Sequence, residues 1–257
     1  MTMFENNSAT GELVGRRALV TGGSRGIGAA VVRQLLAAGA QVVATARSAT
    51  STVPDGAAFV AADVRTRAGT EALAGAAQEM FGEIDIVVHN AGGARPFERS
   101  SAIPDEQWQE ALDLNLLAAV RLDALLTPAM RERRTGAIVH ISSAAVPAAV
   151  GPFLHYTAAK AALENYSRGL AAELAPFGIR VNTVLPGRTA TPGGEATRKL
   201  WAELVPSEEN GVGALPPLGR DGQPDDIAHA VSFLLSERAG WLTGSSLVVD
   251  GGEFPRG

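Results

Sequence analysis

Short runs of β-branched and other apolar residues alternate along the chain with longer alanine-rich stretches whose apolar positions recur at helical spacing. The predicted strands are residues 17–21, 41–45, 58–61, 84–89, 136–141, 180–185 and 246–249. The predicted helices are residues 27–38, 67–81, 105–133, 155–175, 195–204 and 224–235. This alternation is typical of repeated βαβ units, so we expect an α/β fold: a single doubly wound domain with seven parallel strands and helices on both faces.

The chain shows no repeat, linker or low-complexity tract that would divide it. Residues 1–12 form a polar N-terminal arm, and we expect residues 13–257 to form one domain. One insertion, residues 186–220, is rich in Gly and Pro and holds a short amphipathic stretch around Trp201. A segment of this length in a compact domain is usually a lid or a binding loop, so we interpret it as a substrate lid; a surface excursion is the alternative.

Composition narrows the class of protein. With 257 residues, of which 46% are hydrophobic and 19% charged, the chain can enclose a substantial core. Its 22 Lys and Arg and 27 Asp and Glu give a net charge of -5 without blocks of one sign, which argues against nucleic acid as a partner. The absence of cysteine excludes disulfides, a thiol nucleophile and sulfur-ligated metal sites. A polar start and the lack of a long apolar run argue against secretion and membrane insertion, so we expect a cytoplasmic protein.

Residues 18–28, Ala-Leu-Val-Thr-Gly-Gly-Ser-Arg-Gly-Ile-Gly, form an apolar strand that leads through a glycine turn directly into a helix. Glycines permit positive φ and close approach of the backbone to a pyrophosphate, and the helix N-terminus offers unpaired N–H groups. The spacing of Gly22, Gly26 and Gly28 departs from the common G-x-G-x-x-G fingerprint. It resembles the opening of the short-chain dehydrogenase/reductase family, and the motifs place the chain close to its 3-oxoacyl-[acyl-carrier-protein] reductases. The resemblance implies a single Rossmann domain.

The end of the second predicted strand bears on the choice of cofactor. An acidic residue there binds the ribose of NAD, whereas a basic one accepts the 2′-phosphate of NADP. By register with the family Ala46 stands at the acidic position, Arg47 follows it, and Arg25 approaches from the glycine turn. Two guanidinium groups favour a phosphate, so NADP(H) is the expected cofactor. NAD(H) is the alternative, although Asp55 lies in a turn beyond the strand end.

Further motifs at the ends of later strands resemble the family's cofactor contacts. Asp63-Val64 corresponds to the adenine contact, Asn90-Ala91-Gly92 to the N-A-G motif, and residues 182–187 to the N-x-x-x-P-G segment before the nicotinamide loop. Thr189 replaces the family's usual aliphatic residue, whose contact is made by the backbone. The cofactor site that the resemblance implies comprises Gly22, Ser24, Arg25, Gly26, Ile27, Gly28, Ala46, Arg47, Asp63, Val64, Asn90, Ala91, Gly92, Tyr156, Lys160, Pro186, Gly187, Thr189 and Thr191.

Tyr156 and Lys160 are four residues apart in a predicted helix and therefore share one face. A fixed cation favours the phenolate, so we expect Lys160 to lower the Tyr156 pKa from about 10 toward the working range. Ser143 precedes Tyr156 by the family's separation and is implied to bind the substrate oxygen; Ser142 is the competing candidate. Asn115, in an otherwise apolar helical stretch, resembles the fourth catalytic member, which holds a water for proton supply.

The resemblance implies an oxidoreductase that transfers a hydride between a nicotinamide and a carbonyl or secondary-alcohol substrate, a carbonyl reductase or alcohol dehydrogenase. A catalytically silent NADP-sensing protein and an NAD-dependent alcohol dehydrogenase are the alternatives. The divergent enoyl reductases place their Tyr and Lys further apart than four residues. Extended-branch sugar epimerases use a tighter glycine spacing.

The four histidines, His89, His140, His155 and His229, are far apart in the sequence and show no H-x-x-x-H pairing, so we predict no metal site and structural roles for them. His155 lining the active site is the alternative for that residue. Candidate substrate-pocket residues are Arg95, Phe97, Val146, Ala149, Phe153, Arg188 and Trp201. The apolar members favour a bulky or cyclic ketone, and the arginines would suit a carboxylate, a phosphate or a β-ketoacyl carrier.

The helix predicted at residues 155–175 spreads apolar residues over more than one stripe, more than one helix can bury within its own chain. In the family this helix and its neighbour pair across a two-fold axis, and the last strand makes a second contact. We therefore expect a homotetramer, with a dimer as the alternative.

Overall fold

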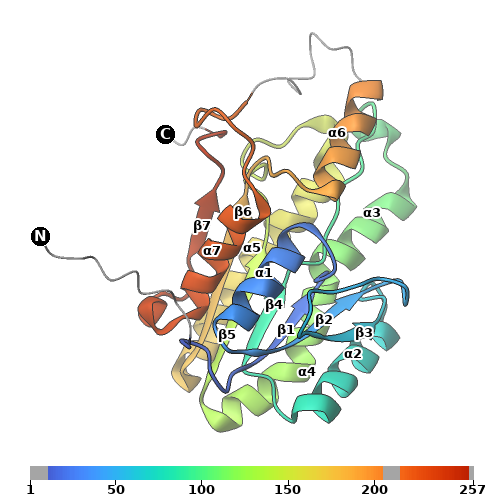
Figure 1. Cartoon of the computed structure of the whole chain (residues 1–257). Coiled ribbons are helices and arrows are strands. Elements are labelled where there is room, and N and C mark those ends of the chain that lie inside the picture. Colours follow the sequence, from blue (N-terminus) through green and yellow to red (C-terminus); the bar gives the residue numbers. More distant parts are fainter. Residues whose placement is uncertain (1–10, 205–214, 255–257) are drawn as a thin grey trace, which may run out of the picture.

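The structure of the chain is a computed structural model, which describes residues 11–204 and 215–254. Residues 1–10 of the predicted arm and residues 205–214 of the predicted lid lie outside the described residues. Seven parallel strands form one sheet in the order β3-β2-β1-β4-β5-β6-β7, which confirms the predicted fold class (Figure 1). The strands are β1 (Arg17–Thr21), β2 (Gln41–Ala46), β3 (Ala58–Ala61), β4 (Ile86–His89), β5 (Gly136–Ile141), β6 (Ile179–Pro186) and β7 (Ser246–Val249).

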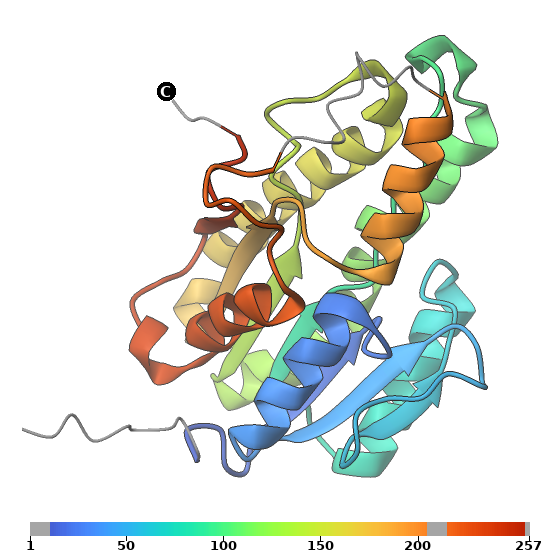
Figure 2. The ribbon, with the colours of Figure 1, turned by 45° about the horizontal axis from the view of Figure 1, so that its top comes forward.

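Helices cover both faces of this sheet. The helices α1 (Gly26–Ala37) and α7 (Pro224–Leu235) pack together on one face, and α2 (Arg67–Phe81), α4 (Ala118–Arg133) and α5 (Leu154–Leu174) cover the other (Figure 1). The remaining helices, α3 (Asp105–Leu112) and α6 (Pro192–Leu204), lie beyond the carboxyl ends of the strands (Figure 2). Short helical turns occur at Ser100–Ala102, Asp113–Leu117, Gly151–Phe153, Ala175–Phe177 and Glu237–Ala239.

Each face of the sheet has its own hydrophobic core. Within β1, Val20 points into the core under α1 and α7, whereas Leu19 points into the core under α2, α4 and α5. Burial on both faces explains why the strands are continuous apolar runs rather than alternating patterns. The arrangement places every strand's carboxyl end at the same edge of the sheet, where α/β proteins bind ligands.

Several predicted boundaries need correction. The predicted strand at residues 84–89 begins instead at Ile86; the preceding Asp85 still bonds through its backbone to Arg17 and Ala137, and its carboxylate accepts hydrogen bonds from the backbone and guanidinium of Arg17. The predicted helix at residues 105–133 is not one helix: a π-helical turn, Asp113–Leu117, separates α3 from α4. The helix predicted from residue 195 begins three residues earlier, at Pro192. The other elements agree with the predicted ranges to within one residue.

Candidate active site

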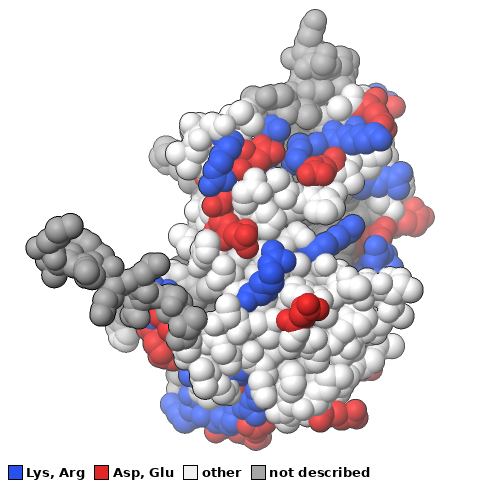
Figure 3. Space-filling model, in the orientation of Figure 1, with Lys and Arg blue, Asp and Glu red and all other residues white. Residues whose placement is uncertain are grey.

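A cavity of about 870 Å³ opens at the carboxyl ends of the strands. Most of the predicted cofactor set lines it: Gly22, Ser24, Arg25, Gly26, Ile27, Ala46, Arg47, Val64, Asn90, Ala91, Gly92, Tyr156, Lys160, Pro186, Gly187, Thr189 and Thr191. Ser143 also lines it, whereas Gly28, Asp63 and Asn115 support the lining from behind or beside it. On the face of the molecule in Figure 3, basic side chains flank the hollow between the α6 side and the α1 side.

The glycine turn has the shape of a phosphate cradle. Gly22 and Gly26 take φ values of +67° and +55°, which side chains rarely tolerate. A Cβ on Gly28 would lie 2.1 Å from the Gly22 carbonyl oxygen, so the third residue of α1 must be glycine for the helix to pack this closely on the turn. Arg25, the residue before α1, makes no side-chain cap to its first turn. The helix N-terminus with its free N–H groups thus fits a pyrophosphate.

The open end of the cavity, where the adenosine of the cofactor is predicted to bind, is formed by exposed groups. Arg25 and Arg47 are both exposed there, with Ala46 at the end of β2. Asp63, the predicted adenine contact, forms an ion pair within the chain: its carboxylate lies 2.6 Å from the Arg65 guanidinium. This hydrogen bond, assisted by the charges of Arg65 and Arg47, lowers the Asp63 pKa. Sequence reasoning missed Arg65, although a basic residue two positions after an acid at a strand end was a visible signal.

Lys160 lies at the opposite, buried end of the cavity and is only 3% exposed. Its Nζ donates a hydrogen bond to the Ile141 carbonyl oxygen at 2.7 Å. Burial lowers the Lys160 pKa to about 8, opposed by the charge of Glu164. A Cβ on Gly92 would come within 3.1 Å of Lys160 Nζ and 3.0 Å of Asn115 Oδ1, so the N-A-G segment keeps this space open.

Tyr156 does not have the predicted low pKa. Burial raises its pKa, while a hydrogen bond with Ser143 opposes the shift. The predicted effect of Lys160 is absent because the ammonium is directed at the Ile141 carbonyl, and it lies 6.0 Å from the Tyr156 ring centre. In this arrangement the phenol is the protonated partner, suited to give a proton.

The two serines that follow β5, Ser142 and Ser143, have different surroundings. The Ser142 hydroxyl donates to a Glu164 carboxylate oxygen at 2.7 Å and is buried against α5. The Ser143 hydroxyl instead interacts with Tyr156. The structure therefore brings Ser143, the serine preferred on spacing, to the tyrosine.

Asn115 lies within the π-helical turn and is 2% exposed. Its Nδ2 donates to the carbonyl oxygens of Gly93 and Ala111 at 3.2 and 3.0 Å, and its Oδ1 accepts from the Gly93 N–H at 3.1 Å. Single π-turns are rare and often mark functional sites. Here the turn fixes the loop after β4 to the helix that carries Asn115. Sequence reasoning identified the residue but not the turn.

The predicted substrate residues are dispersed. Arg188 lines the cavity, where its guanidinium pairs with Asp221 at 2.7 Å. Phe153 and Trp201 stack on each other with ring centres 4.4 Å apart, joining α6 to the start of α5. Arg95, Phe97, Val146, Phe153 and Trp201 are not among the described residues that line the cavity. The α6 side of the lining includes instead Pro192, Gly193, Gly194, Ala196, Thr197, Arg198 and Leu200. All seven lie in the predicted lid, but sequence reasoning proposed none of them as a substrate contact.

Two of the four histidines, His89 and His140, are neighbours in the structure although they are far apart in the sequence. His89 and His140 stack on each other and form a buried cluster with Asp123 beneath the site. The sequence could not show this pairing, because residues 51 positions apart become neighbours only through the sheet register. His155 is 3% exposed and packs edge-on against Phe97 rather than lining the cavity.

Among the described helices, none is both long and apolar enough to cross a bilayer.

The chain has extensive similarity to known proteins. A family model described as "Enoyl-(Acyl carrier protein) reductase" matches residues 22–253. The chain is 37% identical to a 3-oxoacyl-[acyl-carrier-protein] reductase of Escherichia coli over 249 residues, covering 93% of this chain and 98% of that protein. It is 36% identical to an L-rhamnose 1-dehydrogenase (NAD(P)(+)) of Azotobacter vinelandii over 259 residues, covering 94% and 98%.

Solved structures agree in fold as well as in sequence. An L-sorbose reductase from Gluconobacter frateurii, complexed with NADPH and L-sorbose, has a TM-score of 0.84 at 32% identity, covering 97% of this chain and all of that one. A crystal structure described as a putative betaketoacyl-ACP reductase has a TM-score of 0.81 at 37% identity, covering 93% and 98%. This chain thus belongs to the short-chain dehydrogenase/reductase family of oxidoreductases, where it is similar to the 3-oxoacyl-[acyl-carrier-protein] reductases.

Proposed function

We propose that this protein is an NADP(H)-dependent oxidoreductase that transfers a hydride between the nicotinamide and a carbonyl or secondary-alcohol substrate. Ser143, Tyr156, Lys160 and Asn115 are its catalytic set. The observation that carries the proposal is one cavity that has Ser143, Tyr156 and Lys160 at its buried end and the glycine turn with two arginines at its open end. Reduction of a carbonyl needs both: a proton donor and a place for a dinucleotide.

The described residues fit the cofactor along its whole length. The first turn of α1 offers N–H groups to the pyrophosphate, and Arg25 and Arg47 offer guanidinium groups to a 2′-phosphate. The loop after β6, from Pro186 to Thr191, lines the cavity beside the catalytic groups, where the nicotinamide would be held. The bound dihydronicotinamide would supply a hydride to the carbonyl carbon.

The protein's own residues would manage the proton. Because burial keeps the Tyr156 pKa above its ordinary value, the phenol is protonated at neutral pH and donates its proton to the substrate oxygen as the alcohol forms. The Ser143 hydroxyl, next to the phenol, stabilises the same oxygen. Lys160 supplies positive charge close by, and Asn115, anchored in the π-turn, would hold the water that restores the proton.

The substrate is a ketone rather than an enoyl group. The matching family model carries an enoyl reductase description, but the four-residue spacing of Tyr156 and Lys160 favours carbonyl chemistry. The names of the relatives refer to 3-oxoacyl, rhamnose and sorbose substrates, so acyl compounds and sugars are both candidate substrate classes. The substrate pocket that we propose comprises Arg95, Phe97, Val146, Phe153, Arg188 and Trp201, of which Arg188 lines the cavity.

The test is a turnover assay with a substrate panel. Purified protein is mixed with NADPH and, separately, a β-ketoacyl thioester, a ketose, a cyclic ketone and an enoyl thioester. We expect NADPH consumption with at least one ketone and none with the enoyl compound. We also expect NADH to be at least about tenfold less efficient, since each tenfold corresponds to about 1.4 kcal/mol. NADPH binding without turnover of any ketone would support the sensor alternative, and preference for NADH would support the NAD-dependent one.

We also propose that the protein is a homotetramer, as the family's pairing of α4 and α5 implies. Leu125 on α4 is 37% exposed, which is consistent with a helix face that another subunit covers. Light scattering should give about four times the chain mass of 26.5 kDa. A monomer at micromolar concentration would contradict the assignment.

A further inference from the structure

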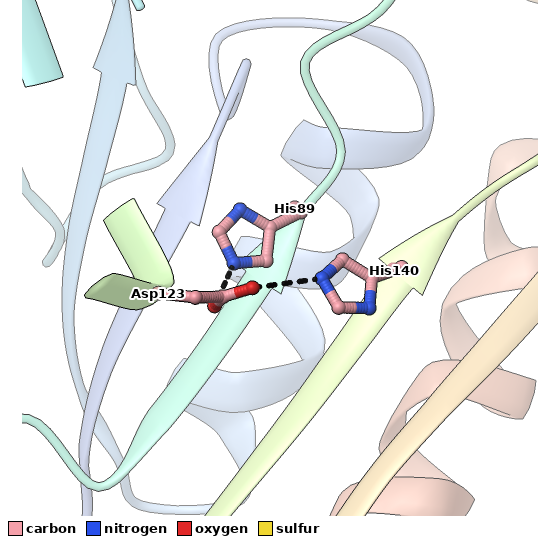
Figure 4. Close-up of side chains that lie close together, drawn as sticks. All are labelled: His89, Asp123 and His140. Atoms are coloured by element: carbon pink, nitrogen blue, oxygen red, sulfur yellow. Dashed lines mark hydrogen bonds and ion pairs between the residues drawn. The ribbon is translucent and has the colours of Figure 1, made fainter. Parts of the chain in front are cut away.

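A polar cluster lies inside the apolar core, one layer beneath the catalytic groups (Figure 4). His89 on β4, His140 on β5 and Thr183 on β6 are direct neighbours in the sheet register and form a polar row on the face covered by α4 and α5. Asp123 projects from α4 toward both histidines, whose rings stack on each other with centres 4.8 Å apart. The four side chains are between 0% and 5% exposed.

The Asp123 carboxylate is the centre of the cluster. One oxygen lies 2.7 Å from His89 Nε2; the other lies 3.2 Å from His140 Nε2 and accepts from the Tyr166 hydroxyl at 3.1 Å. The interaction with the imidazoles holds the Asp123 pKa well below its usual range despite burial, so the carboxylate is ionised and can only accept. Both Nε2 atoms must therefore carry the hydrogen.

The hydrogen bonds continue in one direction across the sheet. Burial lowers the pKa of His140, which is neutral and uses Nδ1 as an acceptor. The Ser167 hydroxyl lies 3.1 Å from this Nδ1 and accepts in turn from the Thr183 hydroxyl at 2.9 Å. The chain of donors thus runs from β6 through α5 and β5 to Asp123 on α4.

The elements that meet at this cluster are those that carry the active site. Directly after His89 comes Asn90 of the N-A-G motif, and three residues after His140 comes Ser143. Tyr166 lies on α5 beyond Lys160, within the helix that begins beside Tyr156. Leu122 and Leu126, neighbours of Asp123 on α4, pack into the core and provide no such directional contact. Hydrogen bonds in a low-dielectric interior have strict geometry, and unpaired donors there are costly, so only one relative placement of these elements satisfies the cluster.

We propose that Asp123 is a positioning residue whose carboxylate, through His89, His140 and Tyr166, holds β4, β5 and α5 in the arrangement that brings Ser143 to Tyr156. The inference rests on the proposed function for its kinetic consequences. It goes beyond that function because it gives a catalytic purpose to four residues that touch neither cofactor nor substrate.

Two histidines and a carboxylate are also common zinc ligands, and these ligand atoms lie within 4.8 Å of one another. The geometry favours hydrogen bonds. Each Nε2 faces a different oxygen of Asp123 at hydrogen-bonding distance, and the two rings stack on each other with centres 4.8 Å apart, so direct contacts among the three side chains already satisfy these polar atoms. Metal content therefore becomes a test: stoichiometric zinc in the purified wild type, absent from Asp123→Asn, would overturn the proposal.

The first experiment compares Asp123→Asn with Leu126→Ala. The asparagine side chain keeps the shape of the Asp123 side chain but replaces one of its two acceptor oxygens by an NH₂ group. This donor would face the Nε2–H of one histidine, so that one hydrogen bond of the cluster is lost. Leu126→Ala, one turn away on the same helix, destabilises the same core without touching the cluster. Values of kcat are calculated per NADPH-binding site, and the number of sites is counted by fluorescence titration. We expect Asp123→Asn to lower kcat about tenfold or more and to keep the NADPH Kd within about twofold of the wild-type value. The Leu126→Ala kcat should stay within about twofold of wild type. Equal kcat for Asp123→Asn and wild type would overturn the proposal.

A double-mutant cycle then tests the route of the effect. If Asp123 acts by placing Ser143, Asp123→Asn in a Ser143→Ala background should cost no more than about a further threefold in kcat. A residue with a merely structural role would give two losses that multiply. Multiplicative losses would therefore overturn the proposal.

A spectroscopic readout works without turnover. The chain has 2 tyrosines, so fluorotyrosine labelling gives two fluorine resonances, which Tyr156→Phe assigns. We expect Asp123→Asn to shift the Tyr156 resonance in the same direction as Ser143→Ala, and Leu126→Ala to leave it in place. A Tyr156 resonance unmoved by Asp123→Asn would overturn the proposal. If wild type turns over no ketone while the resonance moves as expected, the proposed function fails and the positioning role stands.

Discussion

The two ends of the cavity are built in different ways. At the catalytic end, the end that we propose carries out the reaction, Lys160 and Asn115 are buried and hydrogen-bonded to backbone groups of neighbouring segments. At the adenosine end, where we propose that the adenosine of the cofactor binds, Arg25 and Arg47 are exposed side chains on turns that follow β1 and β2. The first end depends on the packing of several elements, and the second on the chemistry of two side chains.

This difference separates chemistry from cofactor choice. A proton donor must be placed to within a fraction of an ångström, which buried and mutually bonded groups achieve. A 2′-phosphate needs mainly positive charge, which flexible surface groups supply. Substitutions at the catalytic end should therefore change turnover, and those at the adenosine end should change which cofactor binds.

The largest effect is expected from Tyr156→Phe. The substitution removes only the hydroxyl that would donate the proton, so the ring still fills its place beside Lys160. We expect kcat for ketone reduction to fall by about 10³-fold, the scale of general acid catalysis. The NADPH Kd should remain within about twofold, because the open end of the cavity is unchanged.

Steady-state kinetics and fluorescence titration on the same preparation measure both quantities. A variant that keeps more than a few per cent of the wild-type kcat would show that another group donates the proton. The idea that turnover depends on the catalytic end, through the Tyr156 hydroxyl, would then be wrong.

The double variant Arg25→Ala/Arg47→Ala should give the next largest effect. Here the affinity for NADPH should change, whereas in Tyr156→Phe it is kcat that falls. Loss of two charge-assisted contacts should weaken NADPH binding by about 10- to 100-fold, since exposed ion pairs contribute less than buried ones. The Kd for NADH should change by less than about threefold, since NADH has no 2′-phosphate. Isothermal titration at two salt concentrations measures this.

Arg33→Ala is the matched control. Arg33 is an exposed arginine of α1 that pairs with Asp225 at 3.9 Å and does not line the cavity. Its removal should leave both affinities unchanged. Equal weakening of NADPH and NADH by the double variant would mean that the arginines bind the pyrophosphate instead.

The sequence predicted the fold well because parallel strands and their glycine turns depend on local patterns. The glycine turn, the strand ends and the four-residue spacing of Tyr156 and Lys160 are all short-range signals. The seven strands consequently agree with prediction to within two residues at each end.

Features that depend on distant residues were not predictable in the same way. The Arg17–Asp85 pair joins the start of β1 to the residue before β4, and the hydrogen bonds of Asn115 to the loop after β4 accompany a π-turn within a predicted continuous helix. The pairing of His89 with His140 arises from the register of β4 and β5. The Tyr156 pKa depends on burial and on where Lys160 points, neither of which the spacing of the two residues specifies.

The pH dependence of reduction should report the catalytic end alone. Burial lowers the Lys160 pKa to about 8, so this side chain is cationic below that pH and loses its charge as the pH rises through it. Because the cation supports proton supply to Tyr156, kcat for reduction should be level at lower pH and fall above about pH 8, by up to tenfold per pH unit. Initial rates at saturating NADPH across pH 6 to about 10 measure the profile.

Arg47→Ala should retain the same break, since Arg47 is at the other end of the cavity. A break that moves with Arg47→Ala would show electrostatic coupling between the ends. A profile without any fall up to about pH 10 would contradict the role of the Lys160 charge.

The smallest effect is expected in the stability of Arg47→Ala. An exposed side chain at a turn contributes little to folding, so its removal should change the free energy of unfolding by less than about 0.5 kcal/mol. At the catalytic end, Asn115→Ala removes buried hydrogen bonds to Gly93 and Ala111 and should cost about 1–2 kcal/mol. Urea unfolding of both variants at equal protein concentration measures the contrast. If Arg47→Ala were destabilised as much as Asn115→Ala, the adenosine end would also depend on packing, and cofactor preference could not be exchanged there without redesigning the fold around it.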